Sequence, residues 1–256
     1  MPTAAEIYYH LHESGREGLT PPIVLIHGAG GTHLYWPPEM RRLTGYRVYA
    51  PDLPGHGKSG GRGMQSISAY TRSVIGWLDV LDLHSVVLIG HSMGGAIALS
   101  LALENPGRVL GLGLVGAGAR LRVSTDLLEQ ASNQATFSGA VAMVISRSFS
   151  PRAAARLVEL ASRRMVEVRP SVLYGDFLAC NEFDVRERLD ELHQPTLVLC
   201  GADDQMTPVR YAQYLASSIH NAVLEIIPDA GHMVMLEQPV VVATAIGEFV
   251  GGIPFY

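Results

Sequence analysis

The chain is poor in several features that would assign it to a special class of protein. Among its 256 residues there are only two cysteines and a single lysine, Lys58. Cys180 and Cys200 stand in apolar surroundings, and neither has a second cysteine or a histidine pattern nearby that is typical of a metal site. No disulfide framework is indicated. We therefore expect two free buried thiols and a reducing, cytoplasmic setting.

Long apolar runs and an excess of positive charge are also lacking. No apolar run approaches the roughly 18 residues that a membrane span requires. The first part of the chain shows neither the basic region nor the apolar core of a secretory signal. The formal net charge is −5, so there is no basic footprint for nucleic acid. These absences favour a protein that acts on a small molecule, and they leave its oligomeric state open.

What is present is a repeated alternation of short apolar runs with amphipathic stretches. With 48% hydrophobic residues the chain can bury a large core as one domain. Runs that are apolar on both faces and separated by helical segments predict an α/β fold, with a mostly parallel sheet covered by helices on both faces. Strands are expected at 23–27, 46–50, 85–90, 109–115, 196–200 and 223–227, and at Ile7 to His12 on the sheet edge. Helices are expected at 66–82, 93–104, 208–219, where Thr207 caps and Pro208 begins the helix, and 238–250.

The alternation is interrupted between residues 119 and 191, where no strand pattern is found. Apolar residues recur at helical spacing from Ala154 to Met165, with charged residues on the other face. Further helical stretches are expected near 126–134, 139–147 and 171–181. We interpret 119–191 as a helical cap, or lid, inserted into a core formed by 1–118 and 192–256.

The most informative motif is Gly90-His91-Ser92-Met93-Gly94, a G-x-S-x-G pentapeptide directly after an apolar run. A serine on the sharp turn between a buried strand and a helix exposes its hydroxyl, and flanking glycines let neighbouring backbone approach closely. We therefore predict that Ser92 is a nucleophile.

An acid and a histidine follow Ser92 in the order that such a mechanism uses. Asp204 and His232 each lie just past an apolar strand, at the sheet end where ligands bind. We expect His232 to act as general base and Asp204 to orient its ring. Asp203 is the rival acid, but the spacing from Gly201 to Pro208 favours Asp204. An acid after the strand 109–115 is excluded, since residues 116–125 contain no carboxylate.

Two backbone N–H groups are expected to stabilise a tetrahedral intermediate. These belong to Met93, at the start of its helix, and to Ala29, in the Gly-rich loop after His27. Two G-x-G-x-x-G matches, at 55–60 and 111–116, do not open a helix after a strand, so we expect no nucleotide cofactor, and no other cofactor or metal ion.

Apolar residues of the cap predict an apolar pocket, although they are equally able to form the cap's own core. These residues are Phe137, Met143, Phe149, Met165, Tyr174, Phe177 and Phe183. We expect Gly28, Met233 and Phe137 to contact substrate. The ten arginines between 120 and 190 would suit a carboxylate or an acidic carrier, but nine acidic residues share the segment. That mixture favours a solvated helix face.

Together these motifs clearly resemble the α/β-hydrolase family, and the similarity covers essentially the whole chain. The motifs that carry it are His27-Gly28, Asp52 to Ser59, Gly90 to Gly94, Gly201 to Pro208, Gly231-His232 and Glu237-Gln238-Pro239. The resemblance implies an eight-stranded, mostly parallel sheet with a helical cap and no required metal.

On this resemblance we expect a carboxylic ester hydrolase, a serine esterase that acts through an acyl-enzyme on small to medium apolar esters. Serine at position 92 argues against the haloalkane dehalogenase and epoxide hydrolase branches, which carry aspartate there. The alternatives on the same triad are a carbon–carbon bond hydrolase, a lactonase, a perhydrolase, a small-molecule synthase or a lyase. A slow-turnover ligand sensor is an alternative of a different class.

Overall fold

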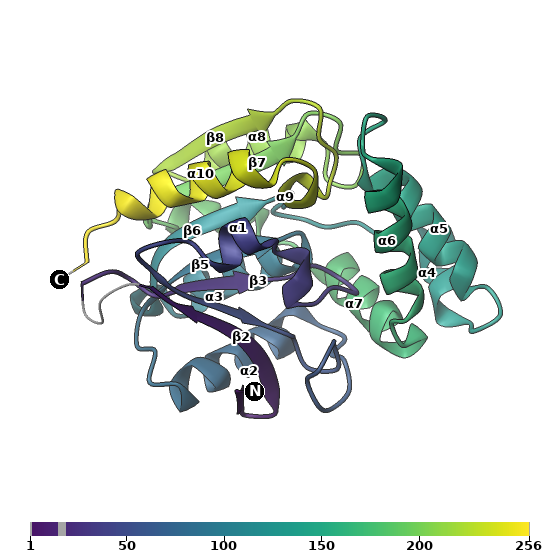
Figure 1. Ribbon diagram of the computed structural model, residues 1–256, viewed down its shortest axis with the longest axis horizontal. Helices are drawn as coiled ribbons and strands as arrows, with labels where there is room; N and C mark the ends of the chain where they lie inside the picture. The colour runs from purple at the N-terminus through teal and green to yellow at the C-terminus, as the bar shows by residue number, and fades with distance from the viewer. Residues whose placement is uncertain (1, 15–18, 256) are drawn as a thin grey trace.

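The computed structural model describes residues 2–14 and 19–255, which form an α/β structure around one sheet (Figure 1). The sheet has eight strands in the order β1-β2-β4-β3-β5-β6-β7-β8. Strands β1 and β2 pair antiparallel, as do β2 and β4, and all the other pairs are parallel. The strands are β1 Thr3–Ala4, β2 Ile7–Glu13, β3 Ile23–Ile26, β4 Arg47–Pro51, β5 Val86–His91, β6 Val109–Val115, β7 Thr196–Gly201 and β8 Ala222–Ile227. The expected fold class is confirmed.

Helices cover both faces because successive side chains of a strand point to opposite sides. Val24 and Leu88 pack in one apolar cluster with helices α2, α3 and α8, whereas Leu25 and Val87 pack in a second cluster with α1, α9 and α10. The helices of the first face are α2 Ile67–Val80, α3 Met93–Glu104 and α8 Val209–Ser218. Those of the second are α1 Pro38–Arg41, α9 Val234–Glu237 and α10 Pro239–Gly251. The central strands are therefore buried on both faces.

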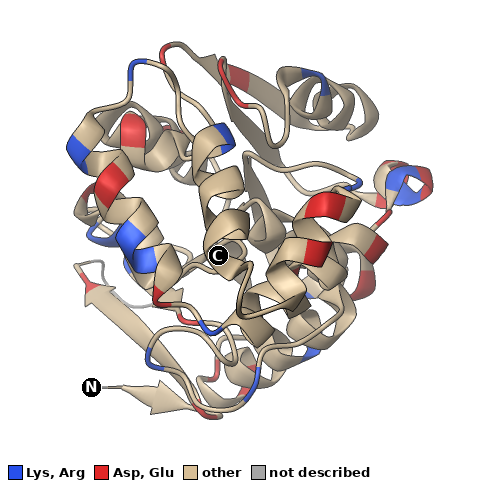
Figure 2. Ribbon diagram, turned by 90° about the vertical axis from the view of Figure 1, so that its right-hand side faces the viewer, with Lys and Arg blue, Asp and Glu red and all other residues tan. Residues whose placement is uncertain are grey.

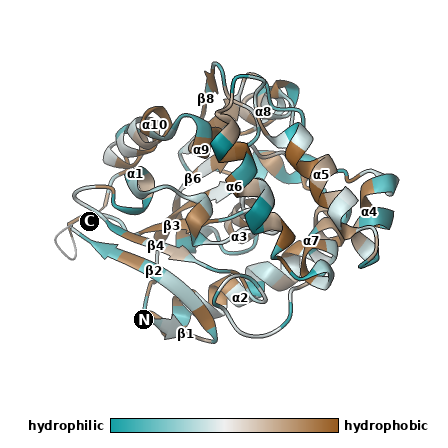
Figure 3. Ribbon diagram, turned by 45° about the vertical axis from the view of Figure 1, so that its right-hand side comes forward, coloured by the Kyte–Doolittle hydropathy of each residue, from teal (hydrophilic) through white to brown (hydrophobic). Residues whose placement is uncertain are grey.

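Four further helices lie between β6 and β7 in the chain and gather at one side of the molecule, on the right in Figure 1. They are α4 Thr125–Ser132, α5 Phe137–Ser148, α6 Ala155–Val166 and α7 Pro170–Glu182, and η3 Arg186–Glu191 leads back to the sheet. We call them the inserted helices. They share a small apolar cluster that contains Phe137, Val141 and Leu173. Figure 3 shows brown and teal segments mixed on these helices, as expected for elements with one buried side.

The structure corrects two expectations, one about the place of β2 in the sheet and one about the start of α8. Strand β2 is not at the sheet edge, because the two-residue strand β1, too short to leave a pattern in the sequence, pairs outside it. Helix α8 begins at Val209, and Pro208 is its N-cap without a side-chain capping bond. Thr207 does not cap this helix, since its hydroxyl is bonded to Asp204 instead.

Charged residues of both signs are spread over the face that carries the inserted helices (Figure 2). Within residues 2–14 and 19–255, no helix is long and apolar enough to cross a membrane.

Candidate active site

A cavity of about 280 Å³ lies between the sheet and the inserted helices. Ser92 and His232 line it from the sheet side, where loops follow strands β5 and β8. The inserted helices contribute mainly apolar side chains, among them Leu127, Met143, Val144, Met165, Leu173 and Phe177. The cavity therefore has a polar wall on the side of the sheet and a mainly apolar lining, with Arg147 as an exception, on the side of the inserted helices.

Ser92 stands on a strained turn between strand β5 and helix α3. Its φ of 54° and ψ of −116° place it in a region that residues other than glycine rarely adopt. The turn is held by a 2.9 Å hydrogen bond from the Ser92 N–H to the Val115 carbonyl. A Cβ on Gly94 would lie 2.2 Å from the Ile26 carbonyl oxygen, so only glycine allows the helix to start this close to β3. The motif therefore presents Ser92 at the carboxyl end of the sheet.

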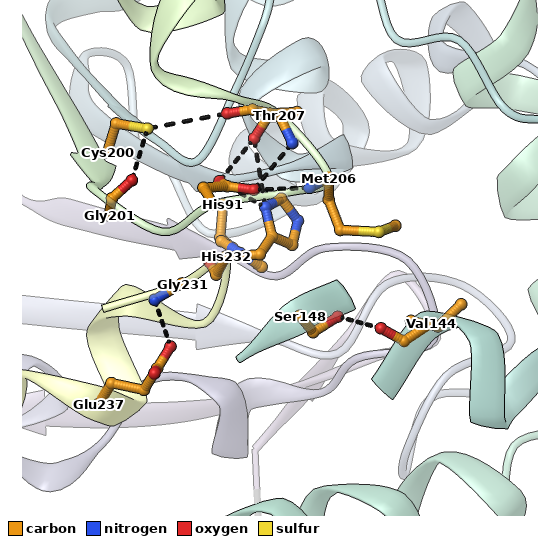
Figure 4. A network of polar contacts seen from close by, with 11 residues as sticks. His91, Val144, Ser148, Cys200, Gly201, Met206, Thr207, Gly231, His232 and Glu237 are labelled. Carbon is orange, nitrogen blue, oxygen red and sulfur yellow. Dashed lines mark hydrogen bonds and ion pairs between the residues drawn. The ribbon is translucent and has the colours of Figure 1, made fainter. Parts of the chain in front are cut away.

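His232 is oriented by the carboxylate of Asp204. The His232 Nδ1–H donates to Asp204 Oδ2 over 2.9 Å, and both side chains are buried. Burial alone would raise the pKa of Asp204, but His232 and hydrogen bonds from Thr207 hold that pKa below its ordinary value. Figure 4 shows the dashed contacts that meet beside the His232 ring. With Nδ1–H committed to Asp204, the Nε2 atom of a neutral His232 can accept a proton.

The two adjacent aspartates have different partners. Asp204 Oδ1 accepts 2.8 Å bonds from the N–H groups of Met206 and Thr207, and its Oδ2 accepts from the Thr207 hydroxyl at 2.8 Å. Asp203 instead accepts a 2.7 Å bond from the Ser150 hydroxyl. The geometry thus joins Asp204, and not Asp203, to His232.

His91 supports the histidine loop, a role that the sequence did not indicate. Its Nε2–H donates over 3.0 Å to the His232 carbonyl, and the two rings lie 4.7 Å apart. Burial and the neighbouring His232 lower the pKa of His91 to about 3. His91 is therefore neutral, and it holds the His232 backbone in place.

The loop after β3 carries the Ala29 N–H and lies against Ser92. A Cβ on Gly28 would lie 3.1 Å from the Ser92 Cβ, so glycine leaves room beside the hydroxyl. Ala29 lines the cavity. Met93 is the first residue of α3, and its N–H has no acceptor within the helix. These two N–H groups belong to the segments that flank Ser92, as an oxyanion site requires.

His27 fixes the base of this loop. Its Nε2 accepts a 2.9 Å bond from the Leu53 N–H, and its Nδ1–H donates 2.8 Å to the Gly28 carbonyl. Burial lowers the pKa of His27 to about 4, so the ring is neutral and each nitrogen has a partner.

Asp176, on inserted helix α7, also anchors the loop. This fully buried carboxylate accepts 2.8 Å from the Gly30 N–H and 2.6 Å from the Tyr70 hydroxyl. It also lies 2.8 Å from His56 Nε2. Burial alone would lower the pKa of His56, but Asp176 outweighs it and raises that pKa above its ordinary value. The only sequence signal for this role is a carboxylate in the middle of the apolar run from Val172 to Cys180.

Glu237 ties the histidine loop to the segment before α6. Its two carboxylate oxygens accept from the Gly231 N–H at 2.8 Å and from the Ser150 N–H at 2.9 Å. Burial raises the pKa of Glu237, partly opposed by these two bonds. Two hydrogen bonds therefore hold the loop that carries His232. One joins the Gly231 N–H to Glu237, and the other joins the His232 carbonyl to His91.

Of the three residues expected to contact substrate, two lie at the cavity or beside Ser92 and one does not. Met233 lines the cavity, and Gly28 lies beside Ser92. Phe137 does not line the cavity, because it is buried in the apolar cluster of the inserted helices. Phe149 and Phe183 are likewise packed in the two core clusters, and only Phe177 among these phenylalanines lines the cavity.

The described residues show no group of three or more histidine, cysteine or acidic side chains arranged to hold a metal ion. Cys180 and Cys200 are both free and buried. Burial raises the pKa of the Cys200 thiol to about 12.

The chain is similar over most of its length to known proteins. The chain is 29% identical over 256 residues to a 2-hydroxy-6-oxo-6-phenylhexa-2,4-dienoate hydrolase of Burkholderia cepacia, covering 90% of this chain and 86% of that protein. It is 28% identical over 252 residues to a pimeloyl-[acyl-carrier protein] methyl ester esterase of Aromatoleum aromaticum, covering 91% and 99%. The solved structure of a thermophilic esterase from Thermogutta terrifontis superposes with a TM-score of 0.86 at 27% identity, covering 96% of this chain and 93% of that one.

One of these relatives is named as a hydrolase of a dienoate, and the other two as esterases. A family model described as the alpha/beta hydrolase family matches residues 23–245, which is most of the chain and spans Ser92, Asp204 and His232. The chain is therefore a member of the alpha/beta hydrolase family, and a hydrolase.

Proposed function

We propose that this protein is a carboxylic ester hydrolase that works through an acyl-enzyme formed on Ser92. The observation that carries the proposal is the contact between Asp204 and His232, in a cavity that Ser92 also lines. In this mechanism His232 takes the Ser92 proton as the hydroxyl attacks the ester carbonyl, and then gives it to the leaving alkoxide. Water, activated by the same histidine, releases the acid and restores the serine.

The negative charge that develops on the ester carbonyl oxygen requires fixed hydrogen-bond donors. We assign this role to the N–H groups of Ala29 and Met93, which lie on either side of the Ser92 turn. The positive end of the α3 dipole adds to the stabilisation at Met93. Removal of one such donor in related mechanisms costs about two to three orders of magnitude in kcat.

The inserted helices act in this proposal as the cap, over residues 119–191, above a core of 1–118 and 192–256. Their contribution to the cavity is mainly aliphatic, aromatic and thioether side chains. Such a lining suits an apolar acyl or alcohol group, and a volume of about 280 Å³ suits small to medium esters.

A carbon–carbon bond hydrolase is the second candidate, because relatives that cleave dienoate and semialdehyde substrates match most of the chain. The same triad serves both reactions, so the esterase and the carbon–carbon bond hydrolase are distinguished by the rate at which each substrate class is turned over.

The test is a panel of p-nitrophenyl esters from acetate to decanoate, run beside a ring-cleavage diketone. An esterase hydrolyses part of the ester series rapidly and the diketone slowly, and Ser92→Ala abolishes the activity. Very slow hydrolysis of every ester, with a phosphonate still labelling Ser92, would exclude the esterase. Rapid diketone cleavage would then identify the carbon–carbon hydrolase.

A further inference from the structure

A second hollow, more open than the first, lies beside the catalytic cavity. It has a volume of about 390 Å³, and four arginines and two tyrosines line it. These are Arg120, Arg122, Arg186, Arg210, Tyr211 and Tyr214. Arg122, Arg210 and Tyr211 also line the catalytic cavity, so the two hollows share a wall. We call this second hollow the arginine groove.

The positive charge of this region is poorly balanced. Arg120 and Arg186 share one carboxylate, Asp184, at 3.5 and 2.7 Å. Among the described residues, Arg122 and Arg210 have no carboxylate within ion-pair distance, and neither has Arg147, which lines the catalytic cavity from α5. No acidic side chain lines either hollow in the described part of the chain.

The three unpaired arginines come from separate segments: Arg122 from the loop after β6, Arg147 from α5 and Arg210 from α8. A solvated helix face, which the sequence alone favoured, would spread its charges along one helix. Arg210 also occupies the first turn of α8, which contains no acidic residue, and there the helix dipole disfavours a cation. An anion at this point would gain from both the helix end and the guanidinium group.

The local charge is opposite in sign to that of the whole protein. The chain has a formal net charge of −5, so the arginine groove does not follow from a generally basic composition. Arg122, Arg147 and Arg210 are exposed to solvent and line one cavity, and their fork-shaped guanidinium groups match carboxylate or phosphate oxygens. The apolar lining from the inserted helices lies in the same cavity as Ser92 and supplies room for an alkyl segment.

We propose that the natural substrate carries a carboxylate or phosphate group at the end remote from the ester, and that Arg122, Arg147 and Arg210 bind this anionic group while the ester lies at Ser92. This inference rests on the proposed esterase function. The substrate class is then a half-ester, an apolar chain with an ester at one end and an anion at the other.

The test compares three p-nitrophenyl esters of equal chain length whose far ends are a carboxylate, an isosteric neutral carboxamide and a phosphonate. The series starts at adipate and extends to sebacate, so that the distance between ester and anion varies. We expect kcat/KM for one anionic ester to exceed that of its carboxamide by about tenfold or more at low salt, and the ratio to fall as sodium chloride screens the charges. The better of the carboxylate and phosphonate arms identifies the anion.

Variants of the arginines locate the effect. The triple variant Arg122→Gln, Arg147→Gln and Arg210→Gln is expected to remove the preference for the anionic ester. The matched control is Arg163→Gln, whose side chain pairs with Glu159 on the exposed side of α6 and which should keep the full ratio.

Three results would overturn the inference. Good hydrolysis of the carboxamide ester without preference for either anion, at every length, would refute it while leaving the esterase proposal intact. Failure of all three esters at every length would refute the inference alone if the plain p-nitrophenyl esters from acetate to decanoate are hydrolysed, and would refute both proposals if those fail as well. A preference that survives in the triple variant would assign the anion to other residues and also refute it.

Discussion

Asp176 and Gly30, which are 146 residues apart in the chain, are joined by a hydrogen bond of 2.8 Å from the Gly30 N–H to Asp176 Oδ2. One residue belongs to inserted helix α7 and the other to the loop that presents the Ala29 N–H. The inserted helices are therefore bonded to the backbone that lies beside Ser92. In this structure they anchor the loop that carries the Ala29 N–H, as well as line the cavity.

We predict that Asp176→Asn lowers kcat by about tenfold or more and changes KM much less, because a loosened loop places its oxyanion donor less well. The substitution keeps the volume but replaces one acceptor oxygen by an NH₂ donor. An NH₂ group at the Oδ2 position removes the acceptor of both the Gly30 N–H and His56 Nε2, and in either orientation His56 loses its counter-charge. Steady-state kinetics with p-nitrophenyl butyrate and urea unfolding separate the two effects.

Tyr70→Phe is the matched control for this experiment. It removes the 2.6 Å bond to Asp176 Oδ1 and the 2.9 Å bond that the hydroxyl accepts from the Met64 N–H, but leaves both the carboxylate and the Gly30 bond in place. We expect a loss of about 1–3 kcal/mol in unfolding free energy, since one buried acceptor loses a partner, and a small change in kcat. If Asp176→Asn also changed kcat only slightly, the hydrogen bond between Gly30 and Asp176 would contribute to stability alone.

The two adjacent aspartates provide a second prediction. Asp204→Asn should lower kcat by about four orders of magnitude, since an amide favours the wrong tautomer of His232. Asp203→Asn should change kcat little, because Asp203 bonds to Ser150 and has no contact with His232. Equal losses in the two variants would contradict this assignment, and a larger loss at Asp203 would reverse it.

The regular elements could be read from the sequence because each has a local cause. The run Val86 to Ile89 is apolar on both faces, and the structure has a buried strand there with α3 directly behind it. The helical stretches between β6 and β7 were also predicted, with ends that differ by a few residues. Strand β1 was missed, since two residues show no periodicity.

Contacts between distant segments could not be predicted in the same way. Thr207 has the sequence context of a helix cap, but its hydroxyl binds Asp204, because the loop turns back over the carboxylate. Phe137 and Phe177 are equally apolar, and only their tertiary positions decide that Phe177 faces the cavity. The arginine groove brings together Arg120, Arg186 and Arg210 from three separate segments, a proximity that no local pattern records.

A third prediction concerns stability and pH. His27 and His91 have ordinary pKa values of 6.5, which burial lowers to about 4 and about 3 in the folded protein. Below pH 6.5 the unfolded chain therefore binds more protons, and each of these histidines lowers the unfolding free energy by about 1 kcal/mol per pH unit. His56 acts in the opposite direction, because its raised pKa adds stability that is present at low pH and lost as pH rises through that value.

We expect the net effect to be a loss of stability as pH falls from about 7 to about 5. Burial lowers the pKa of His27 and His91, and it also lowers that of His10 to about 4, whereas the pKa of His56 is raised. Urea unfolding at several pH values measures the slope, and His27→Gln should make it shallower even if the variant is less stable. NMR titration gives a direct check, in which the rings of His27 and His91 stay neutral throughout this range. Their protonation near pH 6.5 would contradict the prediction.

The last prediction contrasts two phenylalanines of the inserted helices. Phe177 and Phe137 are equally buried, at 4% exposure, but Phe177 lines the cavity and Phe137 packs within the helices' own cluster. Each change to leucine should lower the unfolding free energy by about 1–2 kcal/mol, since each removes apolar contacts from a packed site. Only Phe177→Leu should alter the dependence of kcat/KM on acyl length, because each CH₂ of the acyl chain buried against the cavity wall contributes up to about 0.8 kcal/mol. The measurement is the ester series from acetate to decanoate on both variants at a temperature where both are folded. An altered chain-length profile in Phe137→Leu, with an unchanged profile in Phe177→Leu, would mean that the substrate occupies the helix cluster and not the cavity, as the sequence-based expectation for Phe137 requires.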